Sequence, residues 1–490
     1  MATDAAPSNG GSIAKNTTYL TAALVGQKIL SFLYVLILAR LIGVSITGDY
    51  FSALSFITLF AIFIDLGLTQ ALIRQTARDR QEGLADFRYV LTFKMLSAVV
   101  VVLALLGVIA LLDFYGRPHP DSLFIRWAAV IMVIDSMTNT LYGYFRGLQR
   151  LEFESIGTVI HRVMVMIVGI TGLVLGAHPI ITMSALLVGS LSNFGYASFH
   201  LWRQGVTWRP DLNWPAIRRL LAIAIPFGIA GLFAAIYSSS DNVLLSIFAG
   251  PREVGLYGLS AKIILAFQII PSALVAATFP AMSAAFVNDR SRLTRIFQYS
   301  MQYLMVFCIP LMVVLFLLAK EIILAGWGQV WLDAIWPLRF LALGLPFIFL
   351  NFPVGYLLNS SNQQTRNTIN IGITVVINIV LNLIFISQYS YRSVTVISLC
   401  SSALLFFLGL WFVRRVIPLP WKPLLRTLSK TILAGAIIAA LGWWLLPNLT
   451  GRQGVIQTAL LMGALYVLLI FAFRIVQRKD VFFLVRRLRR

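Results

Sequence analysis

Long apolar segments recur along nearly the whole chain, and they constrain its fold more than any other feature. A helix needs about 20 mostly apolar residues to span a bilayer. Only 12% of the 490 residues are charged, too few to cover the surface of a soluble domain of this length. The predicted fold class is therefore an all-α polytopic membrane protein with about fourteen transmembrane helices, or about twelve or thirteen where connections are very short. The predicted spans are 17–42, 49–73, 88–112, 123–146, 154–177, 179–201, 217–248, 254–280, 297–319, 334–358, 367–388, 391–413, 427–446 and 455–476.

A glycine motif repeats at corresponding places in the two halves of the chain. Gly43-x4-Gly48-x-Tyr50 recurs as Gly250-x4-Gly255-x-Tyr257, each time between two apolar segments. Glycine has no side chain to oppose positive φ, so the spacing predicts a tight turn in each copy. A repeat of this length in an apolar chain indicates a duplicated membrane bundle, and such bundles are mostly transporters.

The same offset predicts how the chain is divided. It gives two six-span lobes, 17–201 and 217–413, joined by a cytoplasmic linker at 202–216. Because six is even, both lobes enter the membrane in the same direction, as parallel repeats with a substrate site between them at mid-depth. The spans in 427–476 have no counterpart in the first half and are predicted to form an appended two-helix hairpin.

The positive charge, +21 overall, is distributed unevenly between the two sides of the predicted bundle. Most of the Lys and Arg residues lie in loops on the side of the N-terminus. By the positive-inside rule both termini face the cytoplasm: a disordered segment, 1–16, and a basic tail, 477–490, against anionic lipid headgroups. A nucleic-acid partner is not expected, because no aromatic-interleaved basic fold accompanies the charge. The opposite loops hold only Arg117, Arg252, Lys320, Arg392 and Arg452.

Motifs of common enzyme classes are missing from the sequence. There is no GxxxxGK[ST] phosphate loop, no HExxH and no GxSxG. Cys308 and Cys400 both lie in predicted spans, which indicates neither a disulfide framework nor a metal site. The longest polar connections are too short to fold alone. We expect no catalytic residue, no metal and no cofactor.

Charged residues deep in the predicted spans are the candidate functional groups, because each costs roughly 3 kcal/mol at the bilayer centre. Lys28 has no obvious partner in its lobe and is the best single candidate to bind an anionic ligand. The other deep charges can be paired as Asp135 with Arg162 and as Asp241 with Lys262. Each pair can bind the substrate, or its two members can simply neutralise each other's charge.

Three further groups receive structural interpretations. His161, beside Arg162, is expected to be a buried, hydrogen-bonded histidine. Lys94 lies close enough to a span end to snorkel to the interface. Asp65 is expected to pair with Arg74 or another cation of the loop, and Glu154 with Arg150.

Span 367–388 carries polar side chains four residues apart, which places them on one helix face. Its amides Asn370 and Asn378 are cavity candidates, since amides suit sugar hydroxyls and phosphate. Hydrogen bonding between helices is at least as good an explanation. Pro226, Pro271 and Pro346 are hinge candidates in the second lobe, although transmembrane helices tolerate proline generally.

Residues 35–80 and 237–285 resemble a known family. LARLIGVSITGDYFSALSF, FIDLGLTQALIRQTAR and SSSDNVLLSIFAGPREVGLYGLSAKI are similar to segments of polysaccharide flippases in the multidrug/oligosaccharidyl-lipid/polysaccharide exporter superfamily. The resemblance implies two lobes around a V-shaped cavity that opens alternately to each side of the bacterial inner membrane. It also implies a substrate, an undecaprenyl-diphosphate-linked oligosaccharide, and partners: membrane lipids, and polymerase and export components.

The relatives that move lipid II extend these implications. Their last two spans form an apolar groove, so by analogy 427–476 would hold the lipid tail. Their cationic cavity residues correspond approximately to Lys28 and Lys262.

Other functions remain open from the residues alone. A cation-coupled multidrug exporter of the same superfamily would favour acidic and aromatic cavity groups. A membrane glycosyltransferase or polymerase would need a large catalytic loop, which this chain lacks. A non-catalytic component of a polysaccharide-synthesis complex would leave the deep charges unexplained.

Overall fold

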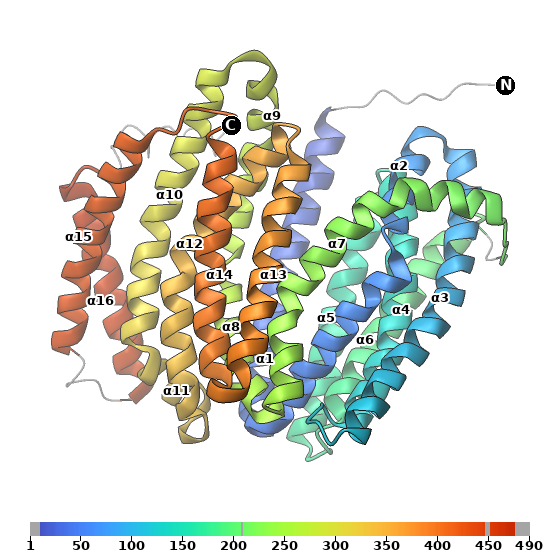
Figure 1. Ribbon diagram of the computed structural model, residues 1–490, viewed down its shortest axis with the longest axis horizontal. Coiled ribbons are helices and arrows are strands. Elements are labelled where there is room, and N and C mark those ends of the chain that lie inside the picture. The colour runs from blue at the N-terminus through green and yellow to red at the C-terminus, as the bar shows by residue number, and fades with distance from the viewer. Residues whose placement is uncertain (1–9, 207–208, 446–450, 476–490) are drawn as a thin grey trace. The chain divides into compact units, whose positions relative to one another are not determined.

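The computed structural model describes residues 10–206, 209–445 and 451–475, and every regular element in these ranges is a helix (Figure 1). The all-α class is thus confirmed. Eleven of the described helices are long and apolar enough to cross a membrane, so the count of fourteen is not confirmed. Spans 17–42 and 49–73 fall largely in one helix, and 123–146 and 179–201 correspond to helices that are less apolar.

The chain divides into two compact units, residues 1–255 and 256–490. In the first unit α1 packs against α4, α5 and α7, α5 packs against α6, and α2 packs against α3 and α4. Helix α7 packs in this unit against α1 and α2, although the repeat assigns it to the second lobe. The helices are α1 (Gly10–Asp65), α2 (Leu68–Arg78), α3 (Arg80–Phe114), α4 (Ser122–Gly147), α5 (Leu151–Val174), α6 (Ile181–Arg203) and α7 (Trp214–Phe248).

The repeated glycine motif forms the turn that its spacing predicts. Gly43 has φ 75° and interrupts α1, and Gly250 has φ 95° between α7 and α8 (Pro251–Ala266). Both values lie in the left-handed region, where a side chain is disfavoured. The second glycine of each copy meets the other copy. A Cβ on Gly48 would overlap the backbone oxygen of Pro251, and one on Gly255 would overlap that of Val44.

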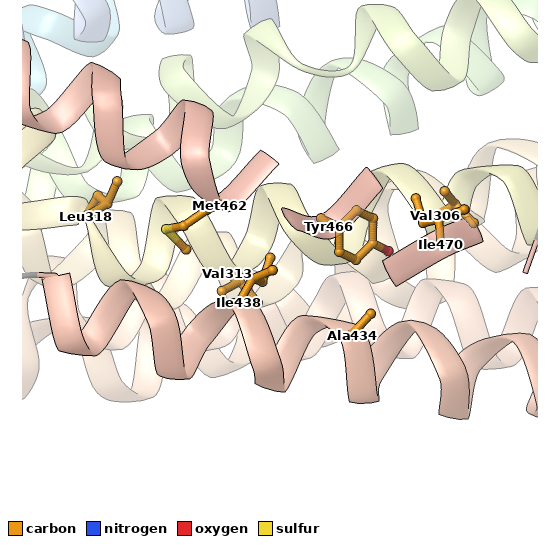
Figure 2. Close-up of a cluster of buried hydrophobic side chains, with 8 residues drawn as sticks. All are labelled: Val306, Val313, Leu318, Ala434, Ile438, Met462, Tyr466 and Ile470. Atoms are coloured by element: carbon orange, nitrogen blue, oxygen red, sulfur yellow. The ribbon is translucent and has the colours of Figure 1, made fainter. Parts of the chain in front are cut away.

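In the second unit α12 packs against α9, α10, α13 and α14, while α10 also contacts α15 and α16. The predicted hairpin is present as α15 and α16. Its apolar side chains form a buried cluster with those of α10, among them Met462, Tyr466 and Val313 (Figure 2). The bounds are α9 (Ile269–Asn288), α10 (Arg290–Leu317), α11 (Ala319–Trp327), η1 (Gln329–Ala334), α12 (Ile335–Ser360), α13 (Gln364–Tyr389), α14 (Tyr391–Val413), α15 (Trp421–Leu445) and α16 (Gly451–Ala472).

The terminal segments and the prolines differ in part from expectation. Helix α1 already begins at Gly10, inside the segment predicted to be disordered, while 1–9 and the whole basic tail, 477–490, lie outside the described residues. Pro226 and Pro346 lie inside α7 and α12, where a proline removes a helical hydrogen bond. Pro271 is the third residue of α9, a position whose N–H has no helical acceptor in any case. The hinge role of the three stays a prediction.

Candidate functional site

Arg162 lies at the centre of a polar cluster in the first unit. Its guanidinium interacts electrostatically with Tyr34 and Tyr50 of α1 and with Asp135 of α4. Arg162 and Asp135 are half-buried, and no ion pair within 4.0 Å joins them in the described part of the chain. The predicted pairing is therefore a proximity without a direct salt bridge. The Nε atom of Arg162 and the hydroxyl of Tyr34 are buried and make no hydrogen bond.

Small residues bring the helices of this cluster close together. A Cβ on Gly169 of α5 would lie 2.7 Å from the Tyr34 hydroxyl oxygen, so α1 can pack directly on α5. On the neighbouring face of α5, His161 packs against Gly189 of α6. Its Nε2 atom is buried without a hydrogen bond, so the expectation of a hydrogen-bonded histidine was wrong for that atom. Arg162 points to α1 while His161 points to α6, because adjacent helical residues face about 100° apart.

A second group of charges lies inside the helix bundle, where Lys94 is fully buried and Asp65 is partly exposed. The side chain of Lys94 on α3 is 0% exposed and forms an ion pair with Asp65, at the end of α1. Its ammonium also donates to the hydroxyls of Thr69 and Thr140, each at 2.8 Å. Both expectations for these residues were wrong. Lys94 does not snorkel, and Asp65 pairs with Lys94, whereas Arg74 is exposed.

Ion pairs at the ends of the helices also differ from the prediction. Arg146 at the end of α4 binds Glu154 of α5 through two hydrogen bonds, one of 2.6 Å from Nε. Arg150 instead contacts Glu152, at 3.1 Å. In the sequence Glu154 is closer to Arg150 than to Arg146, but α4 and α5 are joined by a turn with Gln149 at φ 59°, and across this turn Glu154 meets Arg146.

The remaining predicted cations and Asp241 lie on three helices of the chain, α1, α7 and α8. Lys28 is exposed on the first arm of α1, and Asp241 is buried in α7 of the first unit. Lys262 is half-buried in the part of α8 that belongs to the second unit. The pairing of Asp241 with Lys262 stays a prediction, as does the substrate role of each.

The polar side chains that lie four residues apart on α13 face α14. Asn370 donates to the backbone oxygen of Leu405 at 3.0 Å, and Asn378 donates to the Ser401 hydroxyl at 3.2 Å. Asn382 donates to the Asn378 side-chain oxygen at 3.1 Å. These amides are buried. The bonds of Asn370 and Asn378 to α14 are interhelical hydrogen bonds of the kind that transmembrane bundles commonly use, and the bond of Asn382 lies within α13.

No site among the described residues combines three or more groups that suit a metal ion. The features that remain are long apolar helices, a half-buried arginine and a buried ion pair. Together they define a membrane protein with polar groups inside its helix bundle.

The chain belongs to the polysaccharide biosynthesis protein family, whose model matches residues 13–286, more than half of its length. A second family model, MatE, matches residues 226–384. No curated protein gives a significant match in sequence. The chain thus combines membership of the polysaccharide biosynthesis protein family with a region that is similar to MatE.

Solved structures share the fold. A lipid II flippase, MurJ, in an inward closed conformation matches with TM-score 0.77 at 16% identity, over 94% of this chain and 99% of that one. An inward-facing multidrug resistance MATE family transporter matches with TM-score 0.67 at 16% identity, over 80% of this chain and 94% of that one. A MOP superfamily transporter from Pyrococcus furiosus matches with TM-score 0.58 at 17% identity, over 82% of this chain and 96% of that one.

Proposed function

We propose that this protein is a flippase that moves a polyprenyl-diphosphate-linked oligosaccharide across the bacterial cytoplasmic membrane by alternating access, for cell-surface polysaccharide biosynthesis. The family model supports the polysaccharide context, and the fold shared with a lipid II flippase supports a lipid-linked cargo. The polyprenyl tail of such a cargo can stay in lipid while the headgroup crosses. The headgroup carries a diphosphate, which needs cations and hydrogen-bond donors at membrane depth.

Arg162 is the observation that carries the proposal at the level of a site. A guanidinium has five N–H donors in a planar fork that matches phosphate oxygens. Here it is half-buried, lacks a direct salt bridge and lies beside two tyrosines. In our proposal Arg162 binds the diphosphate, Tyr34 and Tyr50 add hydroxyl donors, and Asp135 balances the charge when the site is empty. Lys28 is a further candidate cation of this unit, and Lys262 stays a separate candidate for substrate binding in the second unit.

The test is translocation of a fluorescent polyprenyl-diphosphate-linked oligosaccharide in liposomes that contain the purified chain. Arg162→Gln should slow translocation at least about tenfold, because a charge-assisted hydrogen bond contributes about 1.5–3 kcal/mol. Arg162→Lys keeps the charge and should retain part of the activity. Arg126→Gln is the matched control, since Arg126 is exposed on α4. Normal translocation by Arg162→Gln would remove Arg162 from the site.

A multidrug exporter is the second candidate, favoured by the MatE match over residues 226–384 and by the MATE-like fold. Such a protein would expel cationic dyes from cells or liposomes. Dye export with no movement of the lipid-linked probe would favour a multidrug exporter over the proposed flippase. The reverse result, or complementation of a strain that lacks its polysaccharide flippase, would favour the flippase.

A further inference from the structure

A forked ion pair ties the start of α7 to the start of α3. Arg219 of α7 binds Glu82 and Asp86, which lie about one turn apart on α3, and its Nη2 atom is 2.8 Å from the Asp86 carboxylate. A planar guanidinium can serve two carboxylates at once through different nitrogens. By the positive-inside rule this end of both helices faces the cytoplasm. The fork, meaning Arg219 with its two carboxylates, has no part in the proposed substrate site.

The two carboxylates of the fork differ in burial. The side chain of Glu82 is 44% exposed, whereas that of Asp86 is 0% exposed. In the described part of the chain, the second oxygen of Asp86 is buried and makes no hydrogen bond. Loss of Arg219 would leave this buried charge without a partner, which costs far more than the loss of an exposed ion pair. The fork therefore opens only when water can reach Asp86, and this favours two discrete states over gradual loosening.

The segment before this arginine also lies along α3. The backbone N–H of Asp211 donates to the hydroxyl of Thr92 at 2.9 Å. Asn213 caps the first turn of α7, so the segment continues directly into the helix. Thr92 lies six residues beyond Asp86, about 9 Å further along the axis of α3. Residues 211–219 thus form a strap that runs along α3 in the opposite direction.

Little apolar packing holds the first part of α7 in place. Between residues 214 and 238 the buried residues of this helix are Ile217, Leu220, Ala224 and Gly228. Pro226 removes a helical hydrogen bond in the same part. The second part of α7 is anchored separately, since Asn242 donates to the Ser55 hydroxyl of α1 at 3.0 Å. The strap is therefore held mainly by its polar contacts with α3, and a proline separates it from the anchored part of its helix.

We propose that the strap leaves α3 during each transport cycle and that the fork of Arg219 holds it closed between cycles. This rests on the proposed transport function. In the closed state the strap covers Thr92 and the fork neutralises Asp86. In the open state water solvates both ends of the fork, and the first part of α7 moves about Pro226. Such an element has two arrangements, and any interaction that differs between them shifts their populations.

Labelling of a cysteine beneath the strap tests the fork without any substrate. Thr92→Cys, with both native cysteines replaced, is labelled by a maleimide in the purified protein. Arg219→Gln/Asp86→Asn leaves no buried charge unpaired and should raise the labelling rate at least about tenfold, the effect of one lost charge-assisted hydrogen bond. Arg218→Gln is the matched control, because Arg218 is the adjacent arginine and is exposed. It should leave the labelling rate unchanged.

A reducible crosslink tests whether the strap has to move. Thr92→Cys/Asp211→Cys is joined by a short bifunctional methanethiosulfonate before reconstitution, with all three residues of the fork kept. We expect translocation of the fluorescent polyprenyl-diphosphate-linked oligosaccharide in liposomes to stop and to resume on reduction. Arg150→Cys/Glu152→Cys, crosslinked in the same way, joins two exposed residues at the start of α5 and should keep the full rate.

The two experiments fail in different ways. Translocation at the full rate with the strap crosslinked would overturn the proposed movement. Equal labelling rates for Arg219→Gln/Asp86→Asn and Arg218→Gln would overturn the role of the fork. If the double variant does not fold, the crosslink decides, because it leaves the fork intact. A wild type that moves no lipid-linked probe would contradict the proposed cargo, while the labelling rates would still decide whether the fork holds the strap closed.

Discussion

Gly48 and Gly255 lie where a neighbouring backbone leaves no room for a side chain. Each faces the residue after the first glycine of the other motif copy, Pro251 and Val44 respectively. Gly48→Ala should therefore force the two turns apart, with a loss of roughly 1–3 kcal/mol or more, as overpacking a core does. The measurement is the apparent melting temperature of the purified protein in detergent.

The control for this change is Gly107→Ala, because Gly107 is exposed in α3 and a Cβ there would meet nothing within 4 Å. It should leave the melting temperature unchanged or raise it slightly, since alanine favours a helix. Equal melting temperatures for Gly48→Ala and the wild type would mean that the turns separate at no cost.

The residues of the candidate site were only partly readable from the sequence. Arg162 and Asp135 were found because charges inside apolar runs are conspicuous. Tyr34 and Tyr50 were not, because a tyrosine in a membrane helix has no unusual composition signal. Lys94 was misread, since distance along the chain from a span end gives no view of the three helices that enclose it.

The buried amides of α13 join this helix to α14 through hydrogen bonds. Asn378→Leu removes the bond to Ser401 on α14 and should cost about 0.6–1.7 kcal/mol, as interhelical hydrogen bonds in membranes do. We expect a lower melting temperature and unchanged translocation per folded molecule. Gln364→Leu, an exposed amide at the start of α13, is the control. A stable Asn378→Leu protein without transport would instead place this amide in the substrate site.

The C-terminal hairpin packs through one face, so two adjacent residues of α16 should behave differently. Met462 is 0% exposed in the cluster with α10 and α15, and Leu461 is 55% exposed (Figure 2). In a bilayer both helices stay in lipid after they separate, so the cavity left by a smaller residue dominates the loss. Met462→Ala should lower stability by about 1–2 kcal/mol, and Leu461→Ala by almost nothing. The same melting assay compares them, and equal values would show that α16 does not depend on this face.

Helix positions were predictable because apolar length and composition set them, and helix α14 has the predicted bounds of 391–413. The breaks within apolar segments were not predictable from the sequence. Span 49–73 is divided at Leu66–Gly67 and span 254–280 near Gln268, where local turns and not hydropathy end the helix. The turn at Gly67 depends on the contact with α7, which no local pattern encodes.

At the scale of the whole molecule, the glycine repeat did not predict the boundary between the two compact units. Helix α7 packs with α1 and α2 in the first unit, whereas the repeat places it in the second lobe. Packing between helices decides which of them form one compact unit, and the spacing of a motif along the chain does not reveal that packing.

The membrane orientation predicted from the charge asymmetry can be tested at the two ends of one helix. Gln81 and Ser122 are exposed, near the start of α3 and just beyond its end. The positive-inside rule places Gln81 in the cytoplasm and Ser122 outside. In a background with Cys308→Ala and Cys400→Ser, we expect a membrane-impermeant maleimide to label Ser122→Cys in intact cells and Gln81→Cys only after lysis. The reverse pattern would invert the topology, and with it the direction in which the proposed flippase faces its cargo.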